Sequence, residues 1–279
     1  MRNEDRYMRM RRQNACVVDP ALIEAWRREE AEPFTGWDFG HIASRSRPQK
    51  PPWSFKSVAR AALRQADRAL DLGTGGGEVL AALHDAFPRV MVATEAHPPN
   101  VAVAHRRLAP LGATLVAYGV EPGKVPVSRV QDTGPCLPFR DGSFDLILDR
   151  HEAYDAPELA RVLASGGVFL TQQLDGRSHA ELLQRFGVAP QWPGVTQDNL
   201  VVELREAGLT IEDARSSWGT LAFSDIGALV YYLKAVPWLV PGFSVARFEA
   251  VLLQLHEELE AAGELRVAEG AFLIRARKR

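Results

Sequence analysis

A cluster of glycines between two apolar segments is the part of this sequence that most directly indicates chemistry. In the stretch ALDLGTGGGEVLAAL, residues 69–83, four glycines occupy the five positions 73–77, and Asp71 stands two residues before them. Glycine reaches positive φ angles without strain and lets a ligand lie against the main chain, and the start of a following helix offers unpaired N–H groups. We therefore predict a ligand-binding turn at residues 73–77.

Two well-known glycine motifs do not describe this turn. The dinucleotide fingerprint G-x-G-x-x-G would need glycine at position 78, which is Glu78, and the phosphate-binding P-loop would need a following G-K-S/T, which is absent. The pattern present over residues 71–77 is acid-x-Gly-x-Gly-x-Gly. A second acid, Glu95, ends the apolar segment MVATE, 24 residues after Asp71.

On these residues the sequence resembles the class I S-adenosylmethionine-dependent methyltransferases, and the resemblance extends over residues 66–175. It implies a Rossmann-like domain that binds S-adenosyl-L-methionine and releases S-adenosyl-L-homocysteine. It also implies that Asp71 organises the turn and the amino group of the cofactor, and that Glu95 accepts both ribose hydroxyls, as a carboxylate can. The turn residues expected under the methionine and ribose parts of the cofactor are Gly73, Thr74, Gly75 and Gly77.

The resemblance further implies an acid after the third strand, followed by an LPF tripeptide. Within VQDTGPCLPFRDGSFDLILDRH, residues 130–151, Asp132 would hold the adenine edge and Leu137 would belong to the adjacent loop wall. One residue more than usual separates Asp132 from the tripeptide.

Catalytic candidates follow from the loop that faces the sulfonium methyl in this family, which is DRHEAY, residues 149–154. Methyl transfer is an in-line displacement, so the enzyme mainly aligns the nucleophile and excludes water. For a hydroxyl or protonated amine acceptor, His151 is the natural proton acceptor and Tyr154 could orient the acceptor. A structural role for His151 at the strand end is an equal alternative. The NPPY signature of nucleic-acid amino-methyltransferases is absent.

The elements that must position these residues alternate along the chain. From residue 57 to residue 174, short segments that are apolar on both faces alternate with amphipathic helices. This pattern is typical of a parallel sheet covered on both sides. We predict a doubly wound α/β domain over residues 56–279, and the resemblance implies seven strands, mostly parallel.

Two additions to this domain are expected. Residues 1–55 form an N-terminal extension with one helix and an aperiodic aromatic segment, which either covers the cofactor as a lid or packs on the sheet edge. Residues 224–263 form a two-helix insert between a strand at 209–223 and the closing strand, with Ser224 as a cap and Gly263 as the terminator. The insert is either additional core or one wall of an acceptor pocket.

Net charge, cysteine spacing and the lengths of apolar runs exclude several classes of protein. The net charge of −2 gives no broad attraction to nucleic acid, and the two cysteines, Cys16 and Cys136, match no zinc-ligand spacing, so we expect no metal and a cytoplasmic protein with reduced thiols. No apolar run reaches the roughly 18 residues that would span a membrane. No Ser-His-Asp order or paired carboxylates indicate a hydrolase.

Three functions then compete. The favoured one is methyl transfer to a small-molecule acceptor. The alternative is an RNA methyltransferase that uses the segments MRMRR and RARKR as phosphate contacts. The third is a protein that binds the cofactor without transferring its methyl group, since fold and function separate easily.

Overall fold

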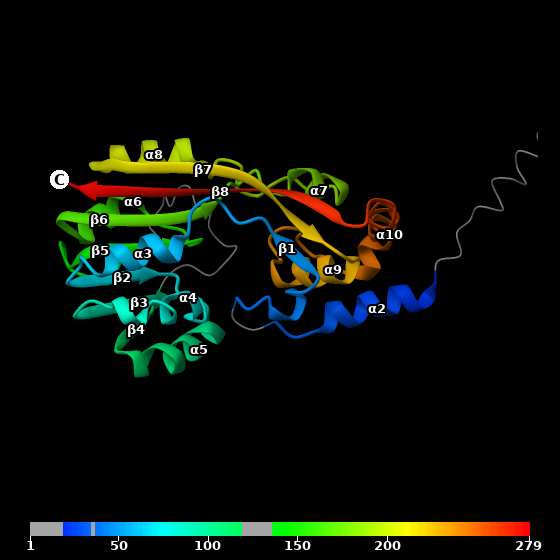
Figure 1. The fold of residues 1–279 in the computed structure, drawn as a ribbon, viewed down its shortest axis with the longest axis horizontal. Helices are drawn as coiled ribbons and strands as arrows, with labels where there is room; N and C mark the ends of the chain where they lie inside the picture. The colour runs from blue at the N-terminus through cyan, green and yellow to red at the C-terminus, as the bar shows by residue number, and fades with distance from the viewer. Residues whose placement is uncertain (1–18, 35–36, 119–135) are drawn as a thin grey trace, which may run out of the picture.

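A sheet of eight strands organises the chain (Figure 1). The structure is a computed structural model and describes residues 19–34, 37–118 and 136–279. The strand order is β1-β7-β8-β6-β5-β2-β3-β4. Five strands are parallel, namely β2 (Arg68–Leu72), β3 (Val90–Glu95), β4 (Ala113–Ala117), β5 (Phe144–Arg150) and β6 (Leu163–Leu174). Three are antiparallel to their neighbours, namely β8 (Leu265–Lys278), β7 (Leu209–Phe223) and β1 (Ser46–Pro48).

The predicted doubly wound, mostly parallel sheet is confirmed, but the strand count of seven was one too low. The additional strand, β1, pairs with the end of β7 over only three residue pairs, from Ser46↔Phe223 to Pro48↔Leu221. A proline is tolerated in such an edge strand because one side of the strand needs no donor. The short strand covers an edge that β7 would otherwise leave open.

Helices cover both faces of the parallel strands. In β2, Ala69 points to one face and Leu70 to the other, and each joins a separate buried cluster. The first face is covered by α3 (Phe55–Leu63), α4 (Glu78–Ala81) and α5 (Pro98–Leu108), the second by α6 (Ala156–Val162) and α8 (Gln197–Glu206). The strands are apolar on both faces because both faces are buried.

A helical lobe forms the other half of the molecule, and we define it as α2, α7, α9, α10 and residues 37–42. Its helices are α2 (Pro20–Ala31), α7 (Ala180–Arg185), α9 (Ile226–Ala235) and α10 (Val245–Ala262). They pack on the ends of β7 and β8 that extend beyond the parallel strands (Figure 1). The N-terminal helix and the insert thus share one buried core, which includes Trp26, Leu229 and Leu255.

Of the two helix ends predicted for the insert, the C-terminus at Gly263 is confirmed, and the N-cap at Ser224 is wrong. Gly263, with φ of 81°, ends α10 as predicted. The cap of α9 is Asp225 and not Ser224, because its carboxylate accepts the amide of Ala228 at 2.8 Å. Asp225 also takes part in the network that holds the N-terminal segment.

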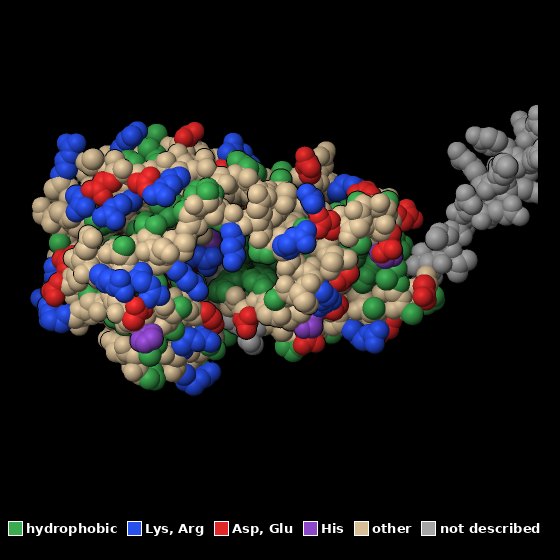
Figure 2. Space-filling view, viewed as in Figure 1, with side chains coloured by type: hydrophobic (Ala, Val, Ile, Leu, Met, Phe, Trp, Pro, Cys, Tyr) green, Lys and Arg blue, Asp and Glu red, His purple; other side chains and the backbone are tan. Residues whose placement is uncertain are grey.

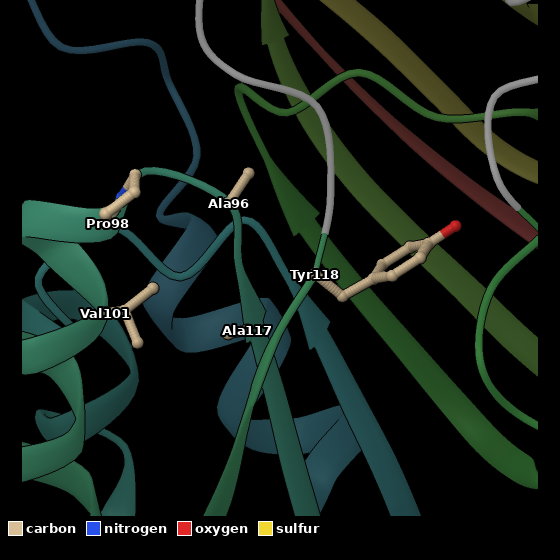
Figure 3. Close-up of a pocket in the computed structure, with 5 residues that line it drawn as sticks. All are labelled: Ala96, Pro98, Val101, Ala117 and Tyr118. Carbon is tan, nitrogen blue, oxygen red and sulfur yellow. The ribbon is translucent and has the colours of Figure 1, made fainter.

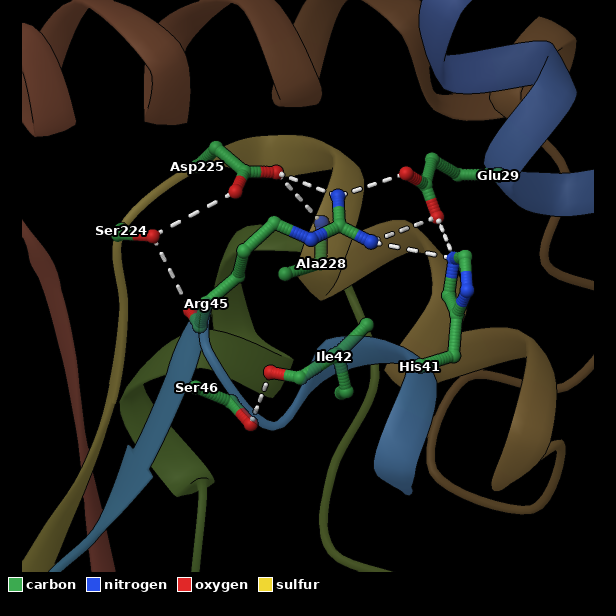
Figure 4. Close-up of polar contacts among 8 residues, drawn as sticks. All are labelled: Glu29, His41, Ile42, Arg45, Ser46, Ser224, Asp225 and Ala228. Atoms are coloured by element: carbon green, nitrogen blue, oxygen red, sulfur yellow. Dashed lines mark hydrogen bonds and ion pairs between the residues drawn. The ribbon is translucent and has the colours of Figure 1, made fainter. Parts of the chain in front are cut away.

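That network centres on Arg45, whose guanidinium lies between Glu29 of α2 and Asp225 of the insert (Figure 4). Its nitrogens donate to the Glu29 carboxylate at 2.6 and 3.2 Å and to Asp225 at 3.4 Å. His41 Nε2 lies 2.8 Å from a Glu29 oxygen. Burial by itself raises the pKa of Glu29, but the contacts with Arg45 and His41 together outweigh this effect and lower that pKa. Three segments far apart in sequence are therefore joined by one set of charges.

We expect the Arg45→Ala substitution to lower the free energy of unfolding by about 1–2 kcal/mol, because it leaves two partly buried carboxylates without their shared donor. Urea denaturation measures the change. Arg27→Ala is the matched control, since Arg27 is more than half exposed and its pair with Glu24 is 3.8 Å long. The control should change the stability by no more than about 0.5 kcal/mol. Equal effects of the two substitutions would contradict the role given to Arg45.

Candidate functional site

The glycine turn lies between β2 and α4, at the carboxyl end of the parallel strands. Its three alternate glycines, Gly73, Gly75 and Gly77, have φ angles of 58°, 63° and 80°. Side chains rarely adopt such angles, so the acid-x-Gly-x-Gly-x-Gly spacing corresponds to three backbone positions that favour glycine. The amide of Thr74 donates to the carbonyl of Thr94 at 2.8 Å, which attaches the turn to β3.

Asp71 and Glu95 lie buried at the ends of β2 and β3, next to this turn. Asp71 is 8 % exposed and Glu95 is 5 % exposed. Burial raises the pKa of Asp71 to about 7, with opposing effects from Thr74 and Arg150. Burial also raises the pKa of Glu95, against the backbone amides of residues 97, 75 and 96. The structure therefore brings together the glycine turn and the two acids that the sequence indicated.

Two side chains from distant segments lie over the turn. A Cβ atom added at Gly73 would overlap the carboxylate of Glu152, and one added at Gly75 would lie 2.6 Å from Cδ1 of Trp37. Glycine is needed at both positions to admit these neighbours as well as to reach positive φ. Trp37 belongs to the aromatic segment that was expected to form a lid, whereas no role was expected for Glu152, although it lies within the DRHEAY segment.

A pocket of about 400 Å³ opens beside Glu95, where β3 and β4 end. Its lining residues are Ala96, Pro98, Val101, Ala117 and Tyr118. Pro98 and Val101 come from α5, whereas the ring of Tyr118 points away from them across the strand ends (Figure 3). The lining side chains are apolar apart from the Tyr118 hydroxyl, which suits a flat aromatic group better than a charged one.

His151 stands at the end of β5 with a positive φ of 67°. Its amide donates to the carbonyl of Gln172 on β6 at 3.0 Å. The side chain keeps access to solvent, yet the many protein atoms around it lower its pKa to about 3, and the neighbouring Arg150 guanidinium lowers it further. The ring is therefore neutral at neutral pH and a weak proton acceptor, since a general base works best with a pKa near the working pH.

Tyr154 lies in the core, in the buried cluster on the α6 face of the sheet. It is 6 % exposed, and its ring packs edge-on against Phe169 at 4.9 Å. Its hydroxyl has no hydrogen-bond partner among the described residues, and burial raises its pKa well above the ordinary value of tyrosine. The buried position does not suit the acceptor-orienting role expected from the sequence.

Asp132 was expected at the adenine edge and Leu137 in the adjacent loop wall, and the structure describes only Leu137. Asp132 lies outside the residues that the structure describes. Leu137 is held by α6, where its amide donates to Glu158 at 2.9 Å and its carbonyl accepts from Arg161 at 3.0 Å. Its side chain packs against the buried cluster on the α6 face of the sheet.

Aromatic side chains connect the turn to the helical lobe. The ring of Trp37 lies 5.6 Å from that of Trp238, and Phe39 lies 5.7 Å from Tyr232. Figure 2 shows that the molecule is hollowed between the sheet and the lobe, with hydrophobic side chains at the bottom and Lys and Arg side chains on the rim. Trp218 lies outside this group of rings: it is 48 % exposed, and the Arg177 guanidinium lies over its ring.

Within residues 19–34, 37–118 and 136–279, no group of three or more His, Cys, Asp or Glu side chains is arranged to hold a metal ion. In the same part of the chain, no helix is both long and apolar enough to cross a membrane.

One stretch of the chain, which includes the glycine turn, matches a known protein family. Residues 70–171 match the family described as methyltransferase domain, and this range includes the glycine turn, Glu95 and the end of β5. A comparison with curated protein sequences gives no match.

Solved structures share the fold. A candidate methyltransferase of Bacillus halodurans aligns with a TM-score of 0.52 at 17 % identity, over 79 % of this chain and 99 % of that one. The YcgJ protein of Bacillus subtilis aligns with a TM-score of 0.51 at 19 % identity, over 80 % and 97 %. A protein of unknown function from Deinococcus radiodurans gives 0.50 at 15 % identity, over 83 % and 89 %. Residues 70–171 therefore carry a methyltransferase domain, and the fold of the chain is that of the class I methyltransferases.

Proposed function

We propose that this protein transfers the methyl group of S-adenosyl-L-methionine to a small-molecule acceptor. The observation that carries the proposal is the position of Trp37, which lies against Gly75 of the glycine turn and against Trp238 of the helical lobe. Through these two contacts, aromatic side chains of the lobe lie beside the turn. Such a site suits a small acceptor, because closure excludes water from the displacement.

The residues of the turn fit this cofactor. Three positive-φ glycines leave the main chain open to a ligand, and the Glu95 carboxylate lies beside the turn, where it can accept ribose hydroxyls. The apolar pocket at Ala96 and Val101 would take the adenine ring. The cofactor supplies a methyl group on a positively charged sulfur, so the protein has to align the acceptor and exclude water.

On the acceptor side we retain His151 and leave out Tyr154. His151 keeps a solvent-accessible side chain at the end of β5, and as a neutral ring it can hydrogen-bond to an acceptor and orient it. Its low pKa makes it a poor general base. The acceptor would lie between His151 and the wall formed by Trp37 and Trp238, with the N-terminal extension as the lid.

The described basic residues give little support to RNA as the acceptor. In the C-terminal RARKR segment, Arg275 and Arg277 both bond to Glu212 of β7. Lys278 donates to the carbonyl of Leu163 at 2.8 Å, and Arg279 donates to Thr210 at 2.9 Å. These side chains are bonded to residues of the sheet or its edge, so they are poorly placed to contact RNA phosphates.

A labelling experiment tests the proposal. The protein is incubated with host extract and S-adenosylmethionine labelled in its methyl group, and acid-soluble and acid-precipitable fractions are counted with and without ribonuclease. We expect label in the soluble fraction that ribonuclease does not change. Precipitable label lost on ribonuclease treatment would establish an RNA acceptor. Cofactor binding by calorimetry without any transfer would favour the non-catalytic protein.

We expect Asp71→Ala and Glu95→Ala each to weaken cofactor binding about tenfold to a hundredfold, the value of a lost hydrogen bond to a charged group. Calorimetric titration measures the affinity. Asp67→Ala is the control, because Asp67 precedes β2 at the opposite edge of the sheet, where it is exposed and pairs with Arg89. Undiminished affinity in both variants would overturn the assignment of the cofactor site.

If Trp37 covers the cofactor, Trp37→Ala should weaken cofactor binding about threefold to tenfold by removing a partly buried aromatic contact. Stopped-flow release of the cofactor should show that most of the change is faster dissociation. Trp218→Ala removes an exposed tryptophan that does not touch the turn and should leave both values unchanged. A Trp37→Ala variant that matches the control would remove the evidence for a lid.

A further inference from the structure

Glu152 is the side chain nearest to the start of the glycine turn, and neither the sequence nor the family resemblance gave it a role. Its carboxylate occupies the space into which a Cβ atom at Gly73 would project. This space borders the main chain against which the cofactor is proposed to lie. No ion pair joins Glu152 to a lysine or arginine within the described part of the chain.

We propose that the carboxylate of Glu152 contacts the positively charged methionine end of the bound cofactor. The inference rests on the proposed function and adds a cofactor-contacting residue to it. The positive charges of that end are the sulfonium and the ammonium group. A carboxylate without a cationic partner, held at the glycine turn, is the complementary group.

The backbone N–H and C=O groups of Glu152 are hydrogen-bonded to buried side chains, and these bonds fix its position. The amide of Glu152 donates to Oδ1 of Asp149 at 3.1 Å, and its carbonyl accepts from Nε2 of Gln173 at 3.0 Å. The other oxygen of Asp149 accepts from Thr171 and Gln173, both at 2.9 Å. Asp149 is 0 % exposed, so these bonds lie inside the sheet. The backbone of Glu152 is therefore fixed on both sides.

Like charges surround the carboxylate. Glu95 faces it from β3, and Asp149 faces it from the end of β5. Asp71 adds a further acid from β2, and Arg150 is the cation that acts on Asp71. Burial, with a further contribution from Glu95, raises the pKa of Glu152 to about 8.

Proton release follows from this environment. With a pKa of about 8, the carboxyl is about nine-tenths protonated at pH 7. A cation placed beside it favours the ionised form and lowers its pKa, so binding expels the proton. The apparent affinity for S-adenosylmethionine therefore falls as the pH drops below about 8, because the proton of Glu152 must then be removed when the cofactor binds.

The experiment is calorimetric titration of the full chain with S-adenosylmethionine at pH 7 in phosphate and in Tris, whose ionisation enthalpies differ. The buffer dependence of the heat gives the number of protons released. We expect Glu152→Gln to release about 0.9 proton fewer than the wild type. We also expect the roughly tenfold gain in affinity between pH 6 and pH 7, where the ammonium group of the cofactor stays charged, to shrink in this variant.

Two further variants complete the test. Glu152→Asp keeps the charge on a shorter side chain, so it should retain proton release while it binds less tightly. Glu206→Gln removes an exposed acid at the end of α8 and should behave as the wild type. Circular dichroism melting shows whether each variant remains folded.

The outcomes separate this inference from the proposed function. A Glu152→Gln variant that binds the cofactor with unchanged affinity and unchanged proton release would overturn the contact and leave the methyltransferase proposal standing. A wild-type chain that binds no S-adenosylmethionine would overturn both.

Discussion

The pairing of β7 with β8 is the interaction on which the second half of the molecule depends. The ladder runs from Leu209↔Lys278 to Phe223↔Leu265, well beyond the three-residue edge strand β1. One part of it completes the sheet beside β6, and the other part carries α9, α10 and α2. Apart from a register shift between Ile211 and Asp213, ladder pairing continues along the two strands, so the pair supports the helical lobe as a rigid extension of the sheet. This rigidity places the lobe opposite the carboxyl ends of the parallel strands (Figure 1).

The lobe and the N-terminal extension act as one unit because they share both a core and a charge network. Trp26 of α2 is buried among residues of α9 and α10, and Arg45 connects Glu29 to Asp225. Trp37 belongs to the same segment and lies on the glycine turn. Movement of the extension would therefore change the cofactor side and the acceptor side of the site together.

Electrostatics at the strand ends follow from the same arrangement. Parallel strands place Asp71, Glu95 and Asp149 at one edge of the sheet, where burial raises the pKa of each. Glu152 joins them through the turn after β5. Ionising several buried carboxyl groups that lie close together costs free energy, and a cationic ligand bound beside them offsets this cost. The low pKa of His151 has a related origin, since the protein atoms around its ring and the Arg150 guanidinium disfavour the charged form.

The features that the sequence determined by itself are local. The acid-x-Gly-x-Gly-x-Gly turn, the position of Glu95, the central strands and the Gly263 terminus all follow from residue type and short-range periodicity, and these agree with the structure. The short helices α7 and α8 lacked a strong enough period to be predicted, and β1 exists only because β7 offers an edge.

Tertiary structure alone decided what each candidate side chain can do. Tyr154 and His151 stand three residues apart, yet one is buried against Phe169 and the other reaches solvent. Trp37 meets Gly75, and Glu152 meets Gly73, across separations that no local pattern describes. The physical reason is that burial, pKa and contact depend on atoms brought together from distant parts of the chain, whereas turn geometry depends on the residues of the turn itself.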